Sequence, residues 1–234
     1  MKRKLKIEIG LAVLLLLIAL FGSFLAPYDP LKVNYDFSLQ PPSFLHIFGT
    51  DKLGRDVFSR ILCGAKTSFG LTFLMLFLIV FIGMIVGLIA GLSNDKVESF
   101  FNNIINGLLA FPDTIFAIAI VGIVGAGLFN TVFALALIWW TKYARLTLAL
   151  VKQEKKKNYL VISKMSGVPP LQRIIRYLLP NILSQILVTA FLDIGNMMIS
   201  LAGLSFLGLA SQPPQPEWGA MLYESKQFMQ VAPW

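Results

Sequence analysis

Long apolar stretches that carry few charges constrain this chain more than any other feature of its sequence. They cover residues 9–26, 68–92, 128–151 and 180–204. A helix of about 20 such residues can cross a hydrocarbon core of ~30 Å. Only 14% of the 234 residues are charged and 56% are hydrophobic, whereas about a quarter of a soluble domain is charged. The sequence therefore predicts an all-α, polytopic bundle of transmembrane helices.

The chain divides into four parts and five predicted spans. An N-terminal tail and the first span cover 1–26, and an external loop covers 27–66. A helical core follows at 67–204 and includes a cytoplasmic loop at 152–176, and the remaining residues, 205–234, form an external tail. Within the first loop, residues 55–65 predict a short amphipathic helix on the membrane surface. Pro112 is predicted to kink the third span, because it removes one backbone hydrogen bond.

The basic residues are unevenly distributed, and this predicts the orientation. They cluster in the first six positions and between Lys142 and Arg176. Cytoplasmic segments carry such an excess, so the N-terminus and the 152–176 loop are predicted to face the cytosol. This location also accounts for the net charge of +8 without nucleic acid as a partner. The first apolar run lacks a small-x-small cleavage site, so it is interpreted as an uncleaved span.

Three charged residues lie within the predicted third and fourth spans: Asp113, Lys142 and Arg145. A charge in hydrocarbon is costly and needs a partner. Counted along the helical hairpin around Gly125, Asp113 and Lys142 differ in depth by only about 5 Å at 1.5 Å per residue. We therefore expect Asp113 to pair with Lys142, or with Arg145 one turn further. Alternatively, the two bases extend to the inner interface.

The last span carries a polar stripe. Its residues repeat every three or four positions and therefore share one face of a helix: Gln185, Thr189, Asp193, Asn196 and Ser200, with Met197 and Met198 beside them. Such a stripe can bind neighbouring helices. A single interhelical contact would not need five polar turns, so we favour a stripe that lines a translocation path, with Asp193 able to attract a cation.

Several kinds of chemistry are excluded. The one histidine, His46, and the one cysteine, Cys63, cannot form a metal cage or an internal disulfide. Residues 64–67 faintly resemble the end of a phosphate-binding loop, but Arg60 and Ala65 stand where its two glycines should be. No Ser-His-Asp cluster is apparent. We expect this chain to bind no cofactor and to be no enzyme, so that a partner must supply the energy for active transport.

The cytoplasmic loop carries the most informative motif. Ser163-Lys164-Met165-Ser166-Gly167 is followed by Tyr177-Leu178-Leu179-Pro180. The spacing from Gly167 to Pro180 resembles the EAA loop of ABC importer permeases, although Val161-Ile162-Ser163 replaces Glu-Ala-Ala. Gly167 and the two prolines after it predict a short helix, a turn and a new helix. The resemblance implies that an ATPase is contacted by Ser163, Lys164, Met165, Ser166, Gly167, Val168 and Pro169.

Other stretches narrow the family. They are residues 48–56, 110–112, 143–146, 205–209 and 217–221. These are similar to the second permease of dipeptide, oligopeptide and nickel importers. The resemblance implies a multi-pass protein of the bacterial inner membrane and its lipid. It also implies a second homologous permease, two cytoplasmic ABC ATPases that bind ATP and Mg²⁺, and an extracytoplasmic substrate-binding protein. The family's sixth span would begin where this sequence stops.

The sequence leaves two classes of substrate open. Residues 192–198 resemble nickel-type permeases more than peptide-type ones, and a carboxylate, an amide and thioethers suit a divalent metal or its chelate. We therefore favour nickel or a metal chelate, with dipeptides or oligopeptides as the alternative. A passive channel or receptor remains a rival of another class, which failure to co-purify with any ATPase would favour.

Overall fold

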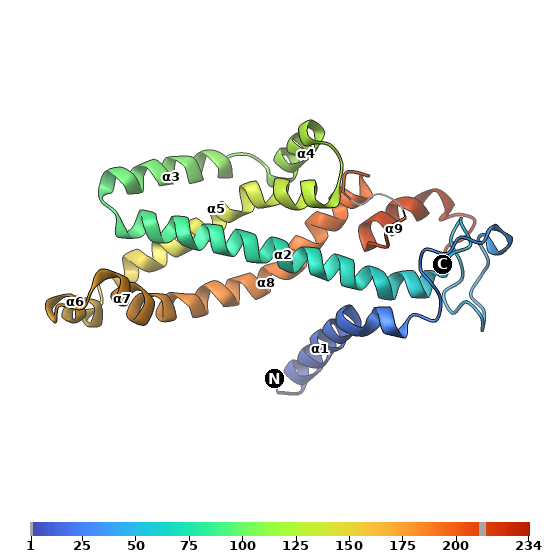
Figure 1. Ribbon diagram of the computed structural model, residues 1–234, viewed down its shortest axis with the longest axis horizontal. Coiled ribbons are helices and arrows are strands. Elements are labelled where there is room, and N and C mark those ends of the chain that lie inside the picture. The colour runs from blue at the N-terminus through green and yellow to red at the C-terminus, as the bar shows by residue number, and fades with distance from the viewer. Residues whose placement is uncertain (1, 211–213) are drawn as a thin grey trace. The chain divides into compact units, whose positions relative to one another are not determined.

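The computed structural model describes residues 2–210 and 214–234, which are helical and contain no β-strand (Figure 1). Four helices are long and apolar enough to cross a membrane, or five if one bent pair counts as a span. The predicted all-helical class is thus confirmed. The helices are α1 (Lys2–Leu25), α2 (Val57–Leu92), α3 (Asp95–Leu109), α4 (Asp113–Val124), α5 (Leu128–Glu154), α6 (Asn158–Met165), α7 (Pro170–Arg173), α8 (Leu179–Phe206) and α9 (Trp218–Ser225). Shorter turns are η1 (Tyr35–Phe37), η2 (Ile174–Leu178) and η3 (Lys226–Phe228).

Two predicted elements differ in the structure. The amphipathic helix expected at 55–65 is no separate element, because its residues form the first turns of the 36-residue helix α2. The predicted third span is not a kinked helix but two helices, α3 and α4, that meet at an angle of 87°. Pro112 lies in the break between them. It cannot donate the hydrogen bond that would continue α3.

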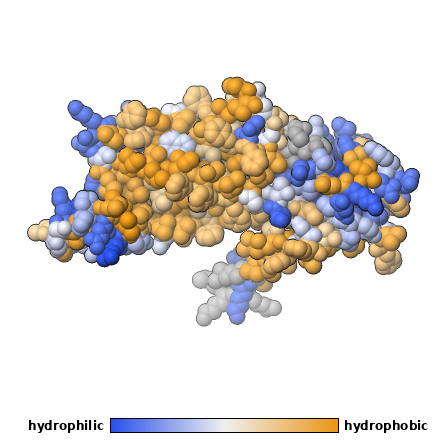
Figure 2. Space-filling model, in the orientation of Figure 1, coloured by the Kyte–Doolittle hydropathy of each residue, from blue (hydrophilic) through white to orange (hydrophobic). Residues whose placement is uncertain are grey.

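The chain forms two compact units, and each is described by itself. Unit 1 contains Met1–Phe73, Val124–Thr131 and Met198–Trp234, and unit 2 contains Leu74–Ile123 and Val132–Met197. Both α2 and α8 contribute residues to each unit. In Figure 2, hydrophobic residues cover the middle of the long helices of unit 2. Hydrophilic residues gather at the end that carries α6 and α7, as expected for a part outside the hydrocarbon.

Unit 2 is held together by a ridge of glycines on α2, namely Gly83, Gly87 and Gly91. A Cβ at Gly83 would lie 2.5 Å from the Cβ of Tyr143, and one at Gly87 would lie 2.6 Å from the carbonyl oxygen of Ala144. The backbones of α2 and α5 therefore approach too closely for any larger residue. Such close approach is a main source of helix association in lipid, where hydrophobic burial between helices contributes little.

In unit 1 the C-terminal helix α9 is fixed against α2. Glu217 is buried and caps α9, accepting hydrogen bonds from the N–H groups of Gly219 and Ala220 and from the Ser68 hydroxyl. The Trp218 ring packs on Phe69, and its Nε1 donates to the Ile61 carbonyl at 3.0 Å. The carboxylate at Glu217 is thus satisfied by three donors, as a buried charge requires.

A second buried cluster in unit 1 joins the external loop to α9. Arg55 donates to Asp51 and to Glu224, each at 2.6 Å. Arg60 lies 3.1 Å from Glu224 and 3.5 Å from Asp51. The Arg60 guanidinium also donates to the carbonyls of Pro30 and Pro214. Two arginines and two carboxylates therefore neutralise one another.

Candidate functional site

The functional site of unit 2 is built around Asp193, the acidic residue of α8. The ammonium nitrogen of Lys142, on α5, lies 2.8 and 2.6 Å from the two carboxylate oxygens. The hydroxyl of Tyr143 donates to the same carboxylate at 2.9 Å. Lys142 and Asp193 both lie near the middle of their helices. The structure therefore contains an ion pair at mid-span depth, with one further neutral donor.

The two charges of this pair differ in exposure. The Asp193 side chain is 7% exposed, whereas that of Lys142 is 49% exposed. On α8, Asp193 lies in line with buried apolar residues, among them Ile186 and Met197. An ionised carboxylate in such a setting is tolerated only with a close counter-charge. Lys142 provides the counter-charge and keeps one side of its ammonium group toward the surface of the unit.

The structure corrects the partner that the sequence predicted for Lys142. In the described part of the chain Asp113 pairs with neither Lys142 nor Arg145, and Lys142 instead binds Asp193. The Asp113 carboxylate accepts a hydrogen bond from the backbone N–H of Thr114 at the start of α4. The depth comparison assumed one helix through Pro112, and the 87° bend there makes that assumption wrong.

Arg145 lies three residues after Lys142 on the same exposed strip of α5. Its guanidinium donates to the side-chain oxygen of Asn106 on α3. No carboxylate in the described residues pairs with it. Lys152, further along α5, has an acidic partner, since it lies 2.8 Å from Glu98 of α3. The strip of α5 that carries Lys142 and Arg145 therefore has one more positive charge than it has counter-ions.

The predicted polar stripe of α8 is only partly turned toward the protein interior. Asp193 alone among its members is buried, and Gln185 and Asn196 are exposed. Thr189 and Ser200 are half-buried, and the Thr189 hydroxyl donates to the Gln185 carbonyl. The neighbouring Met197 is fully buried. An exposed polar strip on a membrane helix needs water or a protein partner, so this face is not suited to lipid.

The loop at 152–176, predicted to be cytoplasmic, has the helix–turn–helix form that its residues predicted. Helix α6 ends at Met165, Gly167 has a φ of +74°, and α7 begins at Pro170 after Pro169. Ser163 is buried and Val168 half-buried, whereas Lys164, Ser166 and Pro169 are exposed. Large apolar side chains also face outward here, including Ile162 (60% exposed), Met165 (82%) and Leu171 (68%). A polar loop with projecting apolar side chains is typical of a surface that binds another protein.

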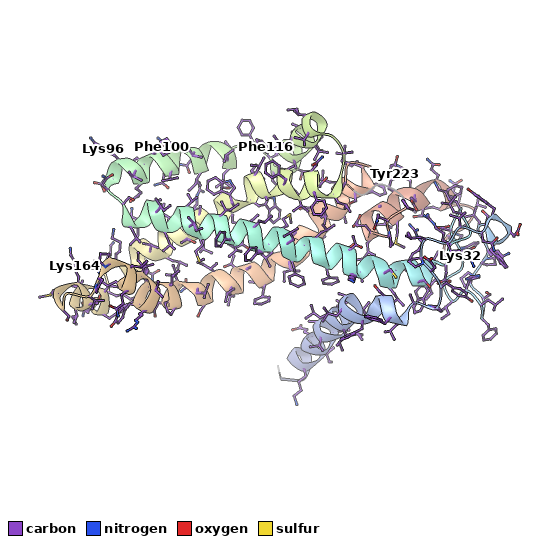
Figure 3. The ribbon with its side chains drawn as sticks, viewed as in Figure 1. Lys32, Lys96, Phe100, Phe116, Lys164 and Tyr223 are labelled. Carbon is purple, nitrogen blue, oxygen red and sulfur yellow. The ribbon has the colours of Figure 1, made fainter. Side chains whose placement is uncertain are left out.

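Three contacts hold the base of this loop. The buried Glu154 carboxylate lies 2.6 Å from the Lys157 ammonium and accepts a hydrogen bond from the Tyr159 hydroxyl. Burial and this hydrogen bond raise the pKa of Tyr159 to about 12, so the phenol stays a donor at neutral pH. Lys155 donates to the carbonyl of Gly91 at the end of α2 at 3.0 Å. Figure 3 shows Lys164 of the loop and Lys96 of α3 at the same end of unit 2.

No metal cluster forms from the residues that the structure describes, since no three His, Cys, Asp or Glu side chains converge. His46 instead lies 2.9 Å from Asp56 and packs against Tyr28. Asp56 also accepts hydrogen bonds from the backbone N–H and hydroxyl of Ser59 and so caps α2. Cys63 is a free, half-buried thiol.

Two parts of this architecture were not predicted from the sequence. The first is the glycine ridge at 83, 87 and 91, whose four-residue spacing is a known signal for close helix packing in membranes. The second is the hydrogen bond that the Tyr143 hydroxyl donates to the Asp193 carboxylate. The position of Tyr143 next to Lys142 was visible, but nothing in the sequence indicated which helix would face it.

Comparisons with known proteins agree with this architecture. Residues 83–232 match the family described as binding-protein-dependent transport system inner membrane component. Residues 9–42 match the N-terminal TM domain of oligopeptide transport permease C. The di/tripeptide transport system permease protein DppC of Pseudomonas aeruginosa is 39% identical over 233 residues, which cover 96% of this chain and 77% of that protein.

Two further relatives have other substrates in their names. The nickel transport system permease protein NikC of Escherichia coli is 34% identical over 94% of this chain and 79% of its own length. The glutathione transport system permease protein GsiD of Shigella flexneri is 39% identical over 94% of this chain and 73% of its own length. The chain therefore belongs to the binding-protein-dependent inner membrane transport family and is a multi-pass permease subunit of an ABC importer.

Proposed function

We propose that this permease forms part of the translocation path for short peptides. The observation that carries the proposal is the ion pair between Asp193 and Lys142. A path for a bare divalent cation would present an uncompensated carboxylate. Here Lys142 already compensates that charge, and Arg145 adds a further cation without an acidic partner in the described residues. Such a surface suits a substrate that carries a carboxylate.

The loop around Gly167 is the element that transmits the energy of ATP hydrolysis. Two cytoplasmic ATPases bind ATP and Mg²⁺, and this chain binds no cofactor itself. Their closure moves α6 and α7, whose exposed apolar side chains fit a groove on a partner. Helix α8 follows from α7 through the π-helical turn η2 and carries Asp193. Rocking of the bundle then exposes the path alternately to the two sides of the membrane.

The complete importer contains partners besides the ATPases. A second homologous permease supplies the other half of the path, and an extracytoplasmic binding protein delivers the substrate. The N-terminus and the 152–176 loop lie in the cytosol, in keeping with their basic residues. The residues of 27–56 lie on the outer side, where the binding protein docks.

Import of nickel as a chelate is the second candidate function. The observation that favours it is the 34% identity to a permease named for nickel transport. The half-buried Met198 near the exposed Asn196 is also a suitable neighbour for a soft metal complex. A chelate with free carboxylates would suit the same positive strip of α5.

Uptake into proteoliposomes distinguishes the candidates. The reconstituted importer, with its binding protein outside and ATP inside, is given radiolabelled alanyl-alanine or radioactive nickel with and without a chelator. Accumulation of the dipeptide that depends on ATP supports the proposal. Accumulation of nickel alone replaces it with the second candidate, and equilibration of either solute without ATP indicates a passive channel.

A further inference from the structure

Lys142 and Arg145 form a pair of cations. The ion pair with Asp193 leaves part of their positive charge and some of their N–H donors available. An ammonium group has three N–H donors, and two of them are directed at the Asp193 oxygens, at 2.8 and 2.6 Å. The Lys142 side chain is 49% exposed, so its remaining donor faces outward. Arg145 lies on the same exposed strip of α5, about 4.5 Å further along the helix axis at 1.5 Å per residue.

This strip of α5 is poorly suited to hydrocarbon. A cation near the middle of a span is costly unless it faces water or protein. Both side chains lie on the exposed strip of unit 2, and Arg145 has only the neutral oxygen of Asn106 as a partner among the described residues. Two cations against one buried carboxylate give the strip a net positive charge. Its charge therefore complements an anion.

We propose that Lys142 and Arg145 together bind the terminal carboxylate of the substrate as it passes through the membrane. The inference rests on the proposed import of short peptides and identifies the group on the peptide that is recognised. A guanidinium offers paired donors that match the two oxygens of a carboxylate. The ammonium of Lys142 supplies a second, compact charge beside it. Asp193 is a positioning residue because it fixes Lys142, and Tyr143 is one because it fixes Asp193. Neither side chain touches the peptide.

The balance of charge explains why Asp193 is present. Two uncompensated cations would hold an anion too tightly for release, since conduction requires that binding be weak enough to leave. Asp193 lowers the net charge of the strip to one. It also holds the Lys142 ammonium between two oxygens, which leaves the third donor with a fixed direction. The site thus has one strong donor group, Arg145, and a second cation, Lys142, whose charge is offset by Asp193.

The test places a thiol next to this pair. Ala149 lies one turn beyond Arg145 on the exposed strip, and its small side chain makes cysteine a mild replacement. In the complete importer in nanodiscs, Cys63→Ser removes the one cysteine of this sequence, and Ala149→Cys introduces the reporter. The new cysteine is labelled with two methanethiosulfonate reagents, one with an anionic sulfonate group and one with a cationic trimethylammonium group. Each labelling rate is divided by the rate at which the same reagent reacts with a free small thiol. We expect a preference of about tenfold for the anionic reagent, from nearby positive charge in a partly dehydrated path.

Variants then show which of the two cations gives the preference. Arg145→Gln abolishes most of it, and Arg145→Lys retains it. Lys142→Gln combined with Asp193→Asn removes both charges of the ion pair and so avoids a lone buried carboxylate. This double variant keeps the preference given by Arg145. Lys96→Gln is the matched control, because it removes one exposed positive charge of unit 2 from α3, about 15 Å along the helix axis from Asn106, and leaves the preference unchanged.

Protection by peptides tests recognition of the carboxylate itself. Alanyl-alanine at millimolar concentration slows the labelling several-fold, whereas alanyl-alanine amide does not. Protection by both to the same degree overturns the proposal, as does the absence of protection. A reporter that neither reagent labels also overturns it, since the strip is then covered by lipid or by another subunit. Uptake of alanyl-alanine by the parent importer is measured in parallel. If uptake is present and the labelling results fail, the inference is wrong and the proposed function stands.

Discussion

Two buried charge clusters in this permease differ in how completely they are enclosed. In unit 1, the side chains of Arg55 and Arg60 are 0% and 1% exposed and those of Glu224 and Asp51 are 9% and 19% exposed. In unit 2, Asp193 is equally buried but its partner Lys142 is 49% exposed. In the first cluster both arginines lie close to the carboxylates of Asp51 and Glu224. Arg60 also donates to two backbone carbonyls. The second cluster keeps a cation at its surface.

The difference separates a structural use of charge from a functional one. A closed set of charges can be stabilising only as a whole, because removal of one member leaves another buried and unpaired. In an open pair the exposed cation can turn to water without that penalty, although the buried carboxylate still needs a counter-charge. Unit 1 therefore uses charge to fix α9 against the loop that precedes α2, and the open pair of unit 2 lies where we propose that a substrate passes. The predictions below test this contrast, from the largest expected effect to the smallest.

Arg55→Met should have the largest effect on folding. It leaves Asp51 and Glu224 with only Arg60, and breaking such a buried network costs about 3–5 kcal/mol. The yield of monodisperse protein and its thermal midpoint in detergent measure the loss. Lys52→Gln, an exposed neighbour in the same loop, is the control and should behave like the parent. Equal midpoints for both variants would show that the network is dispensable.

Lys142→Met should destabilise more than Asp193→Asn. The first leaves a buried carboxylate without a counter-charge, at a cost of about 3 kcal/mol, whereas the second leaves a half-exposed lysine that can turn to water. Thermal midpoints of the two variants and of Lys142→Met with Asp193→Leu give the comparison. The double variant should regain stability and still fail to take up dipeptide. Equal losses in the two single variants would contradict the open character of the pair.

Gly167→Val should impair coupling with little effect on folding. The φ of +74° is costly for a β-branched residue, by about 1–2 kcal/mol, although no heavy atom lies within 4 Å of an added Cβ. The strain should alter the turn between α6 and α7. The measurement is dipeptide uptake alongside co-purification of the ATPases. Gly167→Asn is the control, because asparagine tolerates this backbone conformation, and full uptake by the valine variant would exclude a rigid turn.

Tyr143→Phe should have the smallest effect. It removes one neutral hydrogen bond to Asp193 and keeps the Cβ that lies against Gly83, so about 1 kcal/mol of stability is lost. Uptake should fall only modestly, as the Lys142 contact remains. Gly83→Ala is the informative comparison, because its Cβ would lie 2.5 Å from that of Tyr143 and should separate α2 from α5. A larger loss in Tyr143→Phe than in Gly83→Ala would assign the hydroxyl a greater role.

The long apolar helices were the part of the fold most open to prediction from sequence. Helices α5 and α8 begin and end within a few residues of the predicted spans, because hydropathy over about 20 residues reports directly on the hydrocarbon core. The start of α2 was not predicted. Its first turns combine an apolar face with Arg60 and Lys66, a pattern that suggested a surface helix. One counter-charge of Arg60 is Glu224, 164 positions away in the sequence.

The candidate site was predicted in its residues but not in its pairings. Asp193, Lys142 and Arg145 were each singled out because charges in spans are costly. Which acid meets which base depends on helix packing. That packing involves a break at Pro112 and a glycine ridge whose four-residue spacing indicates close packing but not the helix that packs there. The roles of Gln185, Thr189, Asn196 and Ser200 as path residues, and of 163–169 in coupling, stay predictions that the experiments above address.

The ion pair of Lys142 and Asp193 also has a consequence for how the protein is made. The two residues lie 51 positions apart in the chain, so at about 5–20 residues per second the ribosome needs several seconds to produce the second after the first. During that interval Lys142 of the nascent α5 has no carboxylate from α8 to pair with. Nascent α5 must therefore stay in a hydrated or chaperoned setting until α8 arrives. Ribosome-nascent chains stopped before and after residue 193 should differ in how firmly α5 resists extraction.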